Sequence, residues 1–347
     1  MNSQACLTAS TPLAPESSIG SQLRSINSLE PSMWDRLRKN DQRFGILDND
    51  GRIIPLTSYA AADLPPLSKP LTAVGRFMVR NSPFARILAH RVGKEEVTFY
   101  SLLGQPEGAG IGRVLDRRFL KTGGPPLNWR RNKVVQFVRE SLSESLDRGT
   151  SQITFWDIGS GAGFDSLDVA RQLCRLESLG HSLPSYRLIN VDVDKVWLRH
   201  NEELACALLP KNAQARFRRR NASIFDYLDS ARFRDDLSQT EDLIITCNGF
   251  ADFFALDELR RLLAGIQQAT LLASGHVRMV FPMALKNPWQ QMLSALVGFD
   301  YRARSRRVFE DLLAECIAGM AVSAEVRHSQ VVFVLRRTPL SRAGIAP

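Results

Sequence analysis

The sequence predicts a doubly wound α/β fold: a mostly parallel, seven-stranded sheet with an antiparallel edge, preceded by a helical N-terminal extension. From about residue 152 onward, short buried strand patterns alternate with helical ones, which is typical of a parallel sheet with helices on both faces. The last two segments, at about 321–327 and 330–337, are both strand-like and predict the antiparallel edge. The 347 residues, 44% of them hydrophobic, are enough to bury a sizeable core.

The N-terminal third divides into a tail and a helical region. Residues 1–32 are rich in Ser, Thr and Pro and poor in aromatic residues, which predicts a disordered tail. We expect residues 33–148 to form a mostly helical region that covers the substrate, and residues 149–338 to form the domain that contains the sheet. Residues 339–347 are expected to form a second, short tail.

Apolar residues recur at helical spacing in three places before the sheet: over 71–103, near 113–120 and around 134–142. Gly123-Gly124-Pro125-Pro126 separates the last two. Proline lacks an amide donor and its ring clashes with the preceding turn of a helix, so this run predicts a break. We therefore expect separate helices on either side of it.

Short runs of β-branched and aromatic residues mark the strands, and longer amphipathic runs mark the helices between them. The first strand is expected from Ile153 to Ile158 and the second from Tyr186 to Val191. Crossovers between parallel strands are right-handed in nearly all proteins, so we expect that winding here. Further strands are expected at 215–220, 242–247 and 276–282, and helices at 256–273 and 306–318.

The composition excludes several classes of protein. No apolar run approaches the roughly 20 residues of a membrane span, so none is expected. The 5 cysteines are widely spaced without C-x-x-C and the 5 histidines are scattered, so we expect neither a disulfide framework nor a metal site. The first basic residue is Arg24, which argues against a secretory signal and, with the cysteine usage, favours a cytoplasmic location.

A glycine-rich turn follows the first strand directly, in the run Asp157-Ile-Gly-Ser-Gly-Ala-Gly163. Glycines there allow a tight turn and a close approach to a ligand, and the following helix offers free amide groups. Asp192 ends the second strand, where its carboxylate can accept hydrogen bonds from both ribose hydroxyls of a nucleoside. Asp194 is placed to cap the next helix. These residues predict a cofactor that contains a nucleoside.

Two cofactors use this geometry, a nicotinamide dinucleotide and S-adenosylmethionine (SAM). The dinucleotide pattern G-x-G-x-x-G needs a third glycine where this chain has Phe164, and an acid about 20 residues further on. Here Asp192 lies 33 residues after Gly159, so both features disfavour the dinucleotide. The run G-x-G-x-G preceded by an acid instead resembles motif I of the class I SAM-dependent methyltransferases, whose sheet is Rossmann-like.

The resemblance implies that the glycine loop faces the methionine part of SAM, and that the second-strand acid holds its ribose. Residues after the third and fourth strands would lie beside the adenine and the methyl group. The cofactor-binding residues implied are Asp157, Gly159, Ser160, Gly161, Gly163, Asp192, Asn221, Ala222 and Asn248. Asn221 stands where the family usually has an acid, and Asp226 competes for the adenine contact. Cys247 is expected to be a small core residue.

Four further segments resemble a poorly characterised bacterial family of proposed methyltransferases. They are residues 112–118, 129–133, 248–254 and 288–293. Together with the cofactor motifs, the resemblance covers about residues 110–337. The sequence departs from that family at Ser160, Phe164 and Ala251-Asp252. The resemblance implies methyl transfer as the class of chemistry and names no substrate.

The acceptor is expected to be a small or medium organic molecule, acidic or lipid-like. Enzymes that methylate exocyclic amines of nucleic acids usually have Pro-Pro after an Asn or Asp, whereas Gly249 and Phe250 follow Asn248 here. A base is needed only if the acceptor arrives protonated. The candidate catalytic residues are Asn248 and Asp252, the latter as base or, alternatively, as a surface helix cap. The candidate substrate-contacting residues are Arg130, Arg131, Phe253, Trp289 and Tyr301.

The net charge of +9 is compatible with an anionic partner but does not require one. Basic residues cluster at 216–220, at 302–307 and at 113–133, and the last cluster precedes the cofactor domain, where class I enzymes often place a substrate cover. No interleaved aromatic residues offer a stacking platform, so nucleic acid is not favoured as a partner. Aminocarboxypropyl transfer from SAM, RNA methylation and a non-catalytic SAM-binding role are the alternatives. The sequence leaves the oligomeric state open.

Overall fold

The computed structural model describes residues 45–47, 53–55, 67, 70–90, 97–98, 106, 108–299 and 301–338. The two expected tails, 1–32 and 339–347, lie outside these residues. Within them, β1 (Gly45–Leu47) and β2 (Ile53–Pro55) form a small antiparallel pair of their own.

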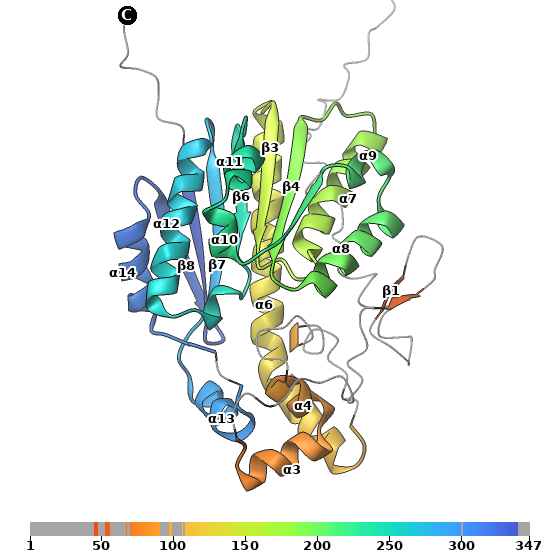
Figure 1. Ribbon diagram of the computed structural model, residues 1–347, viewed down its shortest axis with the longest axis vertical. Helices are drawn as coiled ribbons and strands as arrows, with labels where there is room; N and C mark the ends of the chain where they lie inside the picture. Colours follow the sequence, from red (N-terminus) through yellow and green to blue (C-terminus); the bar gives the residue numbers. More distant parts are fainter. Residues whose placement is uncertain are drawn as a thin grey trace, which may run out of the picture.

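A seven-stranded sheet forms the centre of the molecule and confirms the predicted fold class (Figure 1). Its strands are β3 (Gln152–Ile158), β4 (Ser185–Asp192), β5 (Phe217–Asn221), β6 (Asp242–Thr246), β7 (Val277–Ala284), β8 (Ala321–Arg327) and β9 (Gln330–Arg337). The order is β5-β4-β3-β6-β7-β9-β8, and only β9 runs antiparallel to its neighbours β7 and β8. The chain reverses direction across the sheet between β3 and β6, and such a switch point is where open α/β sheets bind ligands.

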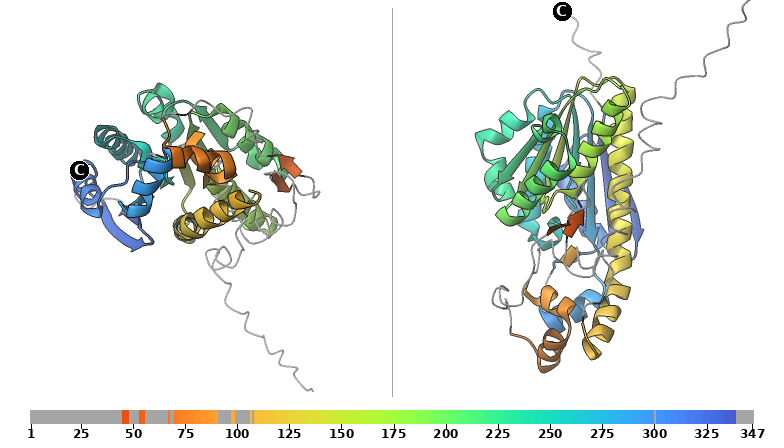
Figure 2. Two further views of the ribbon diagram at one scale, coloured as in Figure 1. Left: turned by 90° about the horizontal axis from the view of Figure 1, so that it is seen from below. Right: turned by 90° about the vertical axis from the view of Figure 1, so that its right-hand side faces the viewer.

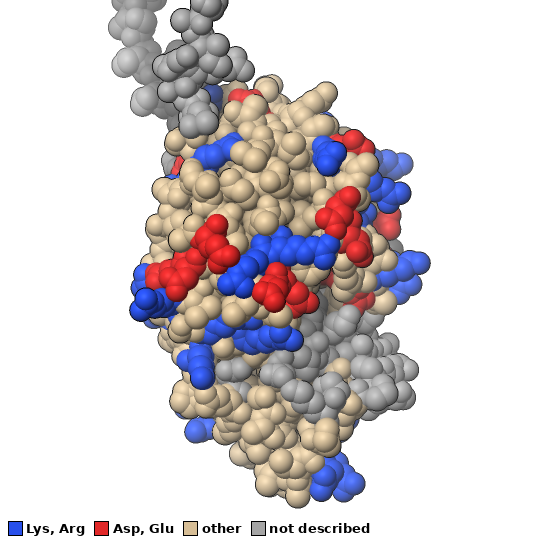
Figure 3. Space-filling view, turned by 60° about the vertical axis from the view of Figure 1, so that its left-hand side comes forward, with Lys and Arg blue, Asp and Glu red and all other residues tan. Residues whose placement is uncertain are grey.

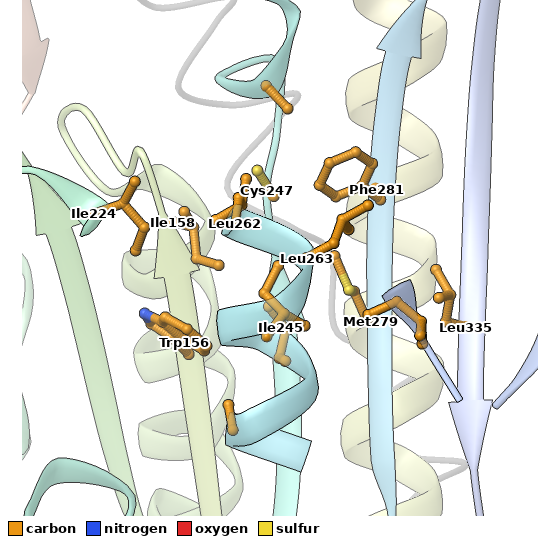
Figure 4. Packing of buried hydrophobic residues seen from close by; sticks show 14 of the residues in the cluster. Trp156, Ile158, Ile224, Ile245, Cys247, Leu262, Leu263, Met279, Phe281 and Leu335 are labelled. Atoms are coloured by element: carbon orange, nitrogen blue, oxygen red, sulfur yellow. The ribbon is translucent and has the colours of Figure 1, made fainter. Parts of the chain in front are cut away.

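Successive residues of a strand point to opposite faces of the sheet, and each face is covered by its own helices (Figures 1 and 2). Phe155 packs in the cluster that contains residues of α6, α7 and α8, whereas Trp156 packs with Tyr227 and Phe233 on the other face. Figure 4 shows part of this second cluster, between the sheet and α12. The helices around the sheet are α6 (Ile111–Asp147), α7 (Phe164–Ser178), α8 (Lys195–Leu208), α9 (Lys211–Gln214), α10 (Ile224–Leu228), α11 (Ala231–Leu237), α12 (Leu256–Leu272) and α14 (Arg306–Cys316).

The predicted break at 123–126 is wrong, because α6 is one helix of 37 residues that contains Pro125 and Pro126 (Figure 2). A proline inside a helix costs about 3 kcal/mol. Gly124 precedes the first proline and has no Cβ to clash with its ring, which lowers that cost. The two halves of α6 also pack in different apolar clusters, through Phe119 before the prolines and Phe137 after them. Burial on both sides therefore holds the helix together across the prolines.

The helical pattern over 71–103 is divided into two helices in the structure, α3 (Ala73–Asn81) and α4 (Pro83–His90). Ser82 separates them: its hydroxyl accepts from the Ala85 amide at 2.9 Å and donates to the carboxylate of Asp116. Asp116 is fully buried on α6 and also accepts from the Gly108 amide at 2.8 Å. Beyond residue 90, most of the predicted segment lies outside the described residues.

We use the term cap for α3, α4, residues 111–127 of α6 and α13 (Pro288–Val297), which pack together beyond the carboxyl ends of the strands (Figure 1). Two glycines let its helices approach closely. A Cβ on Gly75 would lie 1.7 Å from the carbonyl oxygen of Leu296, and one on Gly112 would lie 1.8 Å from that of Asn81. The apolar core of the cap contains Met78, Phe84, Ile87, Leu88, Phe119, Leu120, Leu293, Val297 and Phe299.

Asp242 joins the second half of α6 to the start of β6. Its buried carboxylate accepts from Ser145 Oγ at 2.6 Å and from the His276 amide at 2.9 Å, and it pairs with Arg148. Burial raises the pKa of Asp242, but these hydrogen bonds and the guanidiniums of Arg148 and Arg278 outweigh it and leave the pKa below its usual value. Asp242 therefore contributes stability above about pH 4 that is lost as the pH falls through its folded-state pKa.

We expect Asp242→Asn to lower the free energy of unfolding by about 2 kcal/mol at pH 7, because hydrogen bonds to the charged carboxylate are lost. The difference from the unsubstituted chain should shrink at pH 3. Urea unfolding at both values measures it, with Asp257→Asn as the control, since the Asp257 side chain is 95% exposed. An equal loss at both pH values would contradict the role assigned to the charge.

Candidate functional site

The glycine loop lies at the carboxyl end of β3, at the switch point of the sheet. Gly159, Gly161 and Gly163 all have positive φ, at 65°, 52° and 65°. The Gly159 amide donates to the carbonyl of Val191 at 2.9 Å, which ties the loop to the end of β4. A Cβ on Gly163, where α7 begins, would lie 2.2 Å from Asn190 Nδ2. Glycine is thus required here both by conformation and by space.

Asp192 faces the loop from the end of β4. The Gly161 amide donates to one of its carboxylate oxygens at 2.8 Å and the Asp194 amide to the other at 2.7 Å. A carboxylate oxygen can accept more than one hydrogen bond, so such a group is suited to a ligand's hydroxyls. Asp194 caps α8 by accepting from the Val196 amide at 3.0 Å, which confirms the capping role predicted for it.

Unsatisfied acceptors border the loop. Ser160 Oγ and Asn248 Oδ1 are buried, and neither has a hydrogen-bond partner among the residues that the structure describes. Asp157 is 3% exposed and accepts from Thr246 Oγ1 at 2.9 Å. A buried polar atom without a partner costs about 1–3 kcal/mol, so these atoms fit a ligand that brings its own donors, such as an amino group and ribose hydroxyls. The residues of the loop therefore fit a cofactor of the SAM type.

A cavity of about 290 Å³ extends from the glycine loop to the cap. At one end it is bordered by Gly159, Gly161, Asp192 and Asn248, the residues expected to face the cofactor. The other end lies under the cap. The apolar residues that line it there are Phe84, Leu88, Phe119, Leu127, Leu293 and Phe299.

A buried ion pair borders the cavity between these two ends. Arg130 Nη1 lies 3.3 Å from Asp252 Oδ2, and the two side chains are 9% and 6% exposed. The other oxygen of Asp252 accepts from the Ala284 amide at 2.8 Å. Burial raises the pKa of Asp252, opposed by Arg130 and by that amide. The alternative role of Asp252 as a surface helix cap is therefore wrong, because the carboxylate is inside the molecule.

The other expected substrate residues are placed differently from one another. Phe253 and Tyr301 line the cavity, and burial raises the pKa of Tyr301 to about 12. Arg131 lies nearer the glycine loop, with its guanidinium 5.8 Å from the centre of the Phe164 ring. Trp289 belongs to α13, but its side chain lies outside the described part of the chain.

Asn221 and Ala222 are not among the residues that line this cavity. The side-chain amide of Asn221 donates to the carbonyls of Asp192 and Val193, at 3.2 and 3.0 Å, and so supports the turn after β4. Asp226 is exposed in the first turn of α10. The adenine contact of these residues stays a prediction. Cys247 is fully buried in the core, as predicted, and burial raises the pKa of its thiol.

Two groups of cavity residues were not predicted. One is the apolar lining supplied by the cap. Helical spacing predicts that these residues are buried, but it does not predict which part of the protein each of them packs against. The other is the turn between β8 and β9, where His328, Ser329 and Gln330 reach the cavity. His328 and Ser329 have positive φ, at 51° and 58°. Neither has a sequence motif that would have singled it out.

The arginines at 216–220 serve the fold. Arg219 Nε donates to Asn201 Oδ1 at 2.7 Å, and Arg220 pairs with Asp236 at 2.6 Å. Figure 3 shows basic and acidic side chains side by side on the face that carries α12 and α14, so this face has no extended basic surface. Among the helices that the structure describes, none has both the length and the hydropathy needed to cross a membrane.

The strand order, the antiparallel edge and the glycine loop at the switch point define a Rossmann-like fold of the class I methyltransferase type. No family model matches the chain, and no curated protein matches it either.

Solved structures resemble this chain at low sequence identity and low TM-score. A proposed methyltransferase from Thermobifida fusca is 16% identical with a TM-score of 0.47, over 72% of this chain and 97% of that one. A protein from Bordetella parapertussis proposed to be exported is 13% identical with a TM-score of 0.46, over 82% and 100% of the two chains. A geranyl diphosphate methyltransferase in complex with its substrate and sinefungin is 12% identical with a TM-score of 0.38, over 78% and 100%. Such distant similarity assigns no substrate.

Proposed function

We propose that the chain is a SAM-dependent methyltransferase whose acceptor, a small or medium organic molecule, binds under the cap. One observation carries the proposal: the glycine loop faces Asp192 at the switch point, beside the unsatisfied buried acceptors Ser160 Oγ and Asn248 Oδ1. SAM supplies a methyl group that is already activated on a sulfonium. The remaining tasks of the protein are to position the acceptor and to exclude water.

In this proposal each wall of the cavity has its own task. Asp192 accepts hydrogen bonds from the ribose hydroxyls, and the amides at the start of α7 face the carboxylate of the cofactor. Asn248 borders the cofactor end, where its side-chain oxygen can accept a hydrogen bond from the cofactor. Arg130 and Asp252 face the acceptor, and the cap covers it. Because the cap borders the same cavity as the glycine loop, bound acceptor and cofactor would be enclosed together.

We expect the full chain to bind SAM and S-adenosylhomocysteine, and not NAD. The physical reason is the loop itself, in which the glycine spacing and the distance to Asp192 differ from the dinucleotide pattern. Isothermal titration calorimetry with the three compounds measures this directly. Micromolar NAD binding with no SAM binding would overturn the proposal.

We expect Asp192→Ala to lower the affinity for SAM at least tenfold. Hydrogen bonds to a charged group contribute about 1.5–3 kcal/mol each, and the substitution removes the acceptor for two hydroxyls. Calorimetry measures the affinity, and circular dichroism shows whether the variant is folded, since Asp192 also accepts from the Gly161 amide. Asp235→Ala, at an exposed position of α11, is the control. Unchanged affinity in a folded variant would move the ribose contact to another residue.

A further inference from the structure

The acceptor end of the cavity has two chemically different walls. The cap wall is apolar and consists of Phe84 and Leu88 from α4, Phe119 from α6, and Leu293 and Phe299 from α13 and the segment after it. These five side chains are at most 9% exposed. A ligand that fills the space against them must itself be largely apolar, because polar groups placed there would lose their hydrogen bonds to water.

The opposite wall carries a guanidinium whose hydrogen-bonding capacity is only partly used. Arg130 Nη1 makes both bonds that the structure gives this side chain, at 3.3 Å to Asp252 and 3.4 Å to Gln330, which are long for such bonds. Among the described residues, Nη2 has no partner. It faces Gly249, where an added Cβ would lie 2.5 Å from it. The guanidinium therefore fills the space that a side chain at 249 would need, and it borders the cavity at the same place.

The charges at this wall favour an anionic ligand. Asp252 is the one acid that borders the acceptor end among the described residues, since Asp192 and Asp194 border the cofactor end. Both oxygens of Asp252 already accept hydrogen bonds, from Arg130 and from the Ala284 amide. Arg304 also acts on Asp252 electrostatically. Asp252 is thus shared between two guanidiniums, and Glu258 offsets part of the charge of Arg304.

We propose that the acceptor is a mainly apolar molecule that ends in a carboxylate, with its apolar body against the cap and its carboxylate against Arg130. This inference rests on the proposed function and narrows its acceptor. A carboxylate matches the planar edge of a guanidinium through two parallel hydrogen bonds. An alcohol offers one uncharged oxygen and cannot form this parallel pair, and a protonated amine would be repelled.

The reaction then needs no base. A carboxylate oxygen forms the bond to the methyl carbon, the bond between that carbon and sulfur breaks, and its electron pair stays on sulfur. The products are a methyl ester and S-adenosylhomocysteine, and no proton is exchanged. In this reaction Asp252 is a positioning residue that acts through Arg130.

The test compares two series of three probes, each series with one apolar body. The first series is decanoate, decanol and decylamine, and the second is the matched naphthyl acid, alcohol and amine. Each is titrated calorimetrically into the full chain saturated with S-adenosylhomocysteine. We expect the acid of at least one series to bind at least tenfold more tightly than its alcohol and its amine. Equal binding of acid and alcohol, tighter binding of the amine, or binding of no acid in either series overturns the inference without any variant.

The variants test the residues. Replacing Arg130 alone would leave the buried carboxylate of Asp252 unpaired. The informative variant is therefore the double substitution Arg130→Gln with Asp252→Asn, which removes both charges and keeps a polar side chain at each position. We expect it to bind acid and alcohol equally. Asp252→Asn alone should increase the preference for the acid, a change that a purely structural role would not produce. Arg234→Gln, at an exposed position of α11 outside the cap, should keep the preference of the unsubstituted chain.

Two results separate this inference from the proposed function. A chain that binds S-adenosylhomocysteine but shows no preference for acids disproves the acceptor class alone. A chain that binds acids through Arg130 but does not bind SAM or S-adenosylhomocysteine disproves the proposed function, on which the inference rests. A preference for acids that persists in the double variant also overturns the inference, because Arg130 would then not be its source.

Discussion

Gly163→Ala is expected to abolish measurable SAM binding and to lower the free energy of unfolding by about 2–5 kcal/mol. The added Cβ would lie 2.2 Å from Asn190 Nδ2 and 2.4 Å from Asn201 Nδ2. Both amides are buried and hydrogen-bonded, to Ser166 Oγ and to the Ala162 carbonyl, each at 2.9 Å. Overpacking of a buried site costs about 1–3 kcal/mol, and a non-glycine residue at positive φ adds about 1–2 kcal/mol.

Gly149→Ala is the matched control for backbone strain. Gly149 has φ of 69°, close to the 65° of Gly163, but a Cβ there would meet no atom within 4 Å. The free energy of unfolding of the control should therefore fall only by the cost of backbone strain, about 1–2 kcal/mol. Its affinity for SAM should stay unchanged. Urea unfolding and calorimetry on both variants separate the two costs. Equal losses of stability would show that the clash with Asn190 contributes nothing.

Gly112→Ala is expected to separate α3 from α6 and to remove acceptor turnover, while SAM affinity stays within threefold. The added Cβ would lie 1.8 Å from the carbonyl oxygen of Asn81, a backbone atom that can move only with its helix. The apolar wall of the cavity depends on this helix packing, since Phe84 and Phe119 pack together in the cap core, 5.8 Å between ring centres. The glycine loop has no part in this contact.

Gly123→Ala, on the same helix, is the control for stability. A Cβ on Gly123 meets no atom within 4 Å, so alanine should stabilise the helix by about 0.5–1 kcal/mol. Gly112→Ala should instead destabilise the chain by about 1–3 kcal/mol. Urea unfolding compares the two variants, and turnover of an acidic acceptor together with SAM titration locates the defect. Full turnover in a folded Gly112→Ala variant would contradict the role of the cap.

The cofactor end of the site could be predicted because its signals are local. Gly159, Gly161 and Gly163 have positive φ. Glycine adopts this conformation more readily than other residues, so the glycines in the sequence predict it. Asp192 stands where a strand pattern ends, and parallel strands bring their carboxyl ends to one edge. The strand pattern therefore predicts that the glycine loop and Asp192 lie close together.

The arrangement of the acceptor end could not be predicted in the same way, because it depends on contacts between distant parts of the chain. Arg130 is a candidate substrate contact in the sequence, but nothing near it in the chain predicts its burial against Asp252, 122 residues further along. Phe84 and Leu293 meet in the cap although nothing in their neighbouring residues pairs them. Such contacts depend on how helices pack, and helical spacing shows only that a face is buried.

The sequence by itself determined the sheet, its antiparallel edge and the glycine loop, since strand alternation, helical spacing and glycine conformation are set by neighbouring residues. Only the tertiary structure decided that α6 continues through Pro125 and Pro126, because burial of its two halves in separate clusters compensates for the prolines. It also decided that the cap lies over the switch point with Arg130 inside. The energy of those contacts comes from surfaces that meet only after the chain has folded.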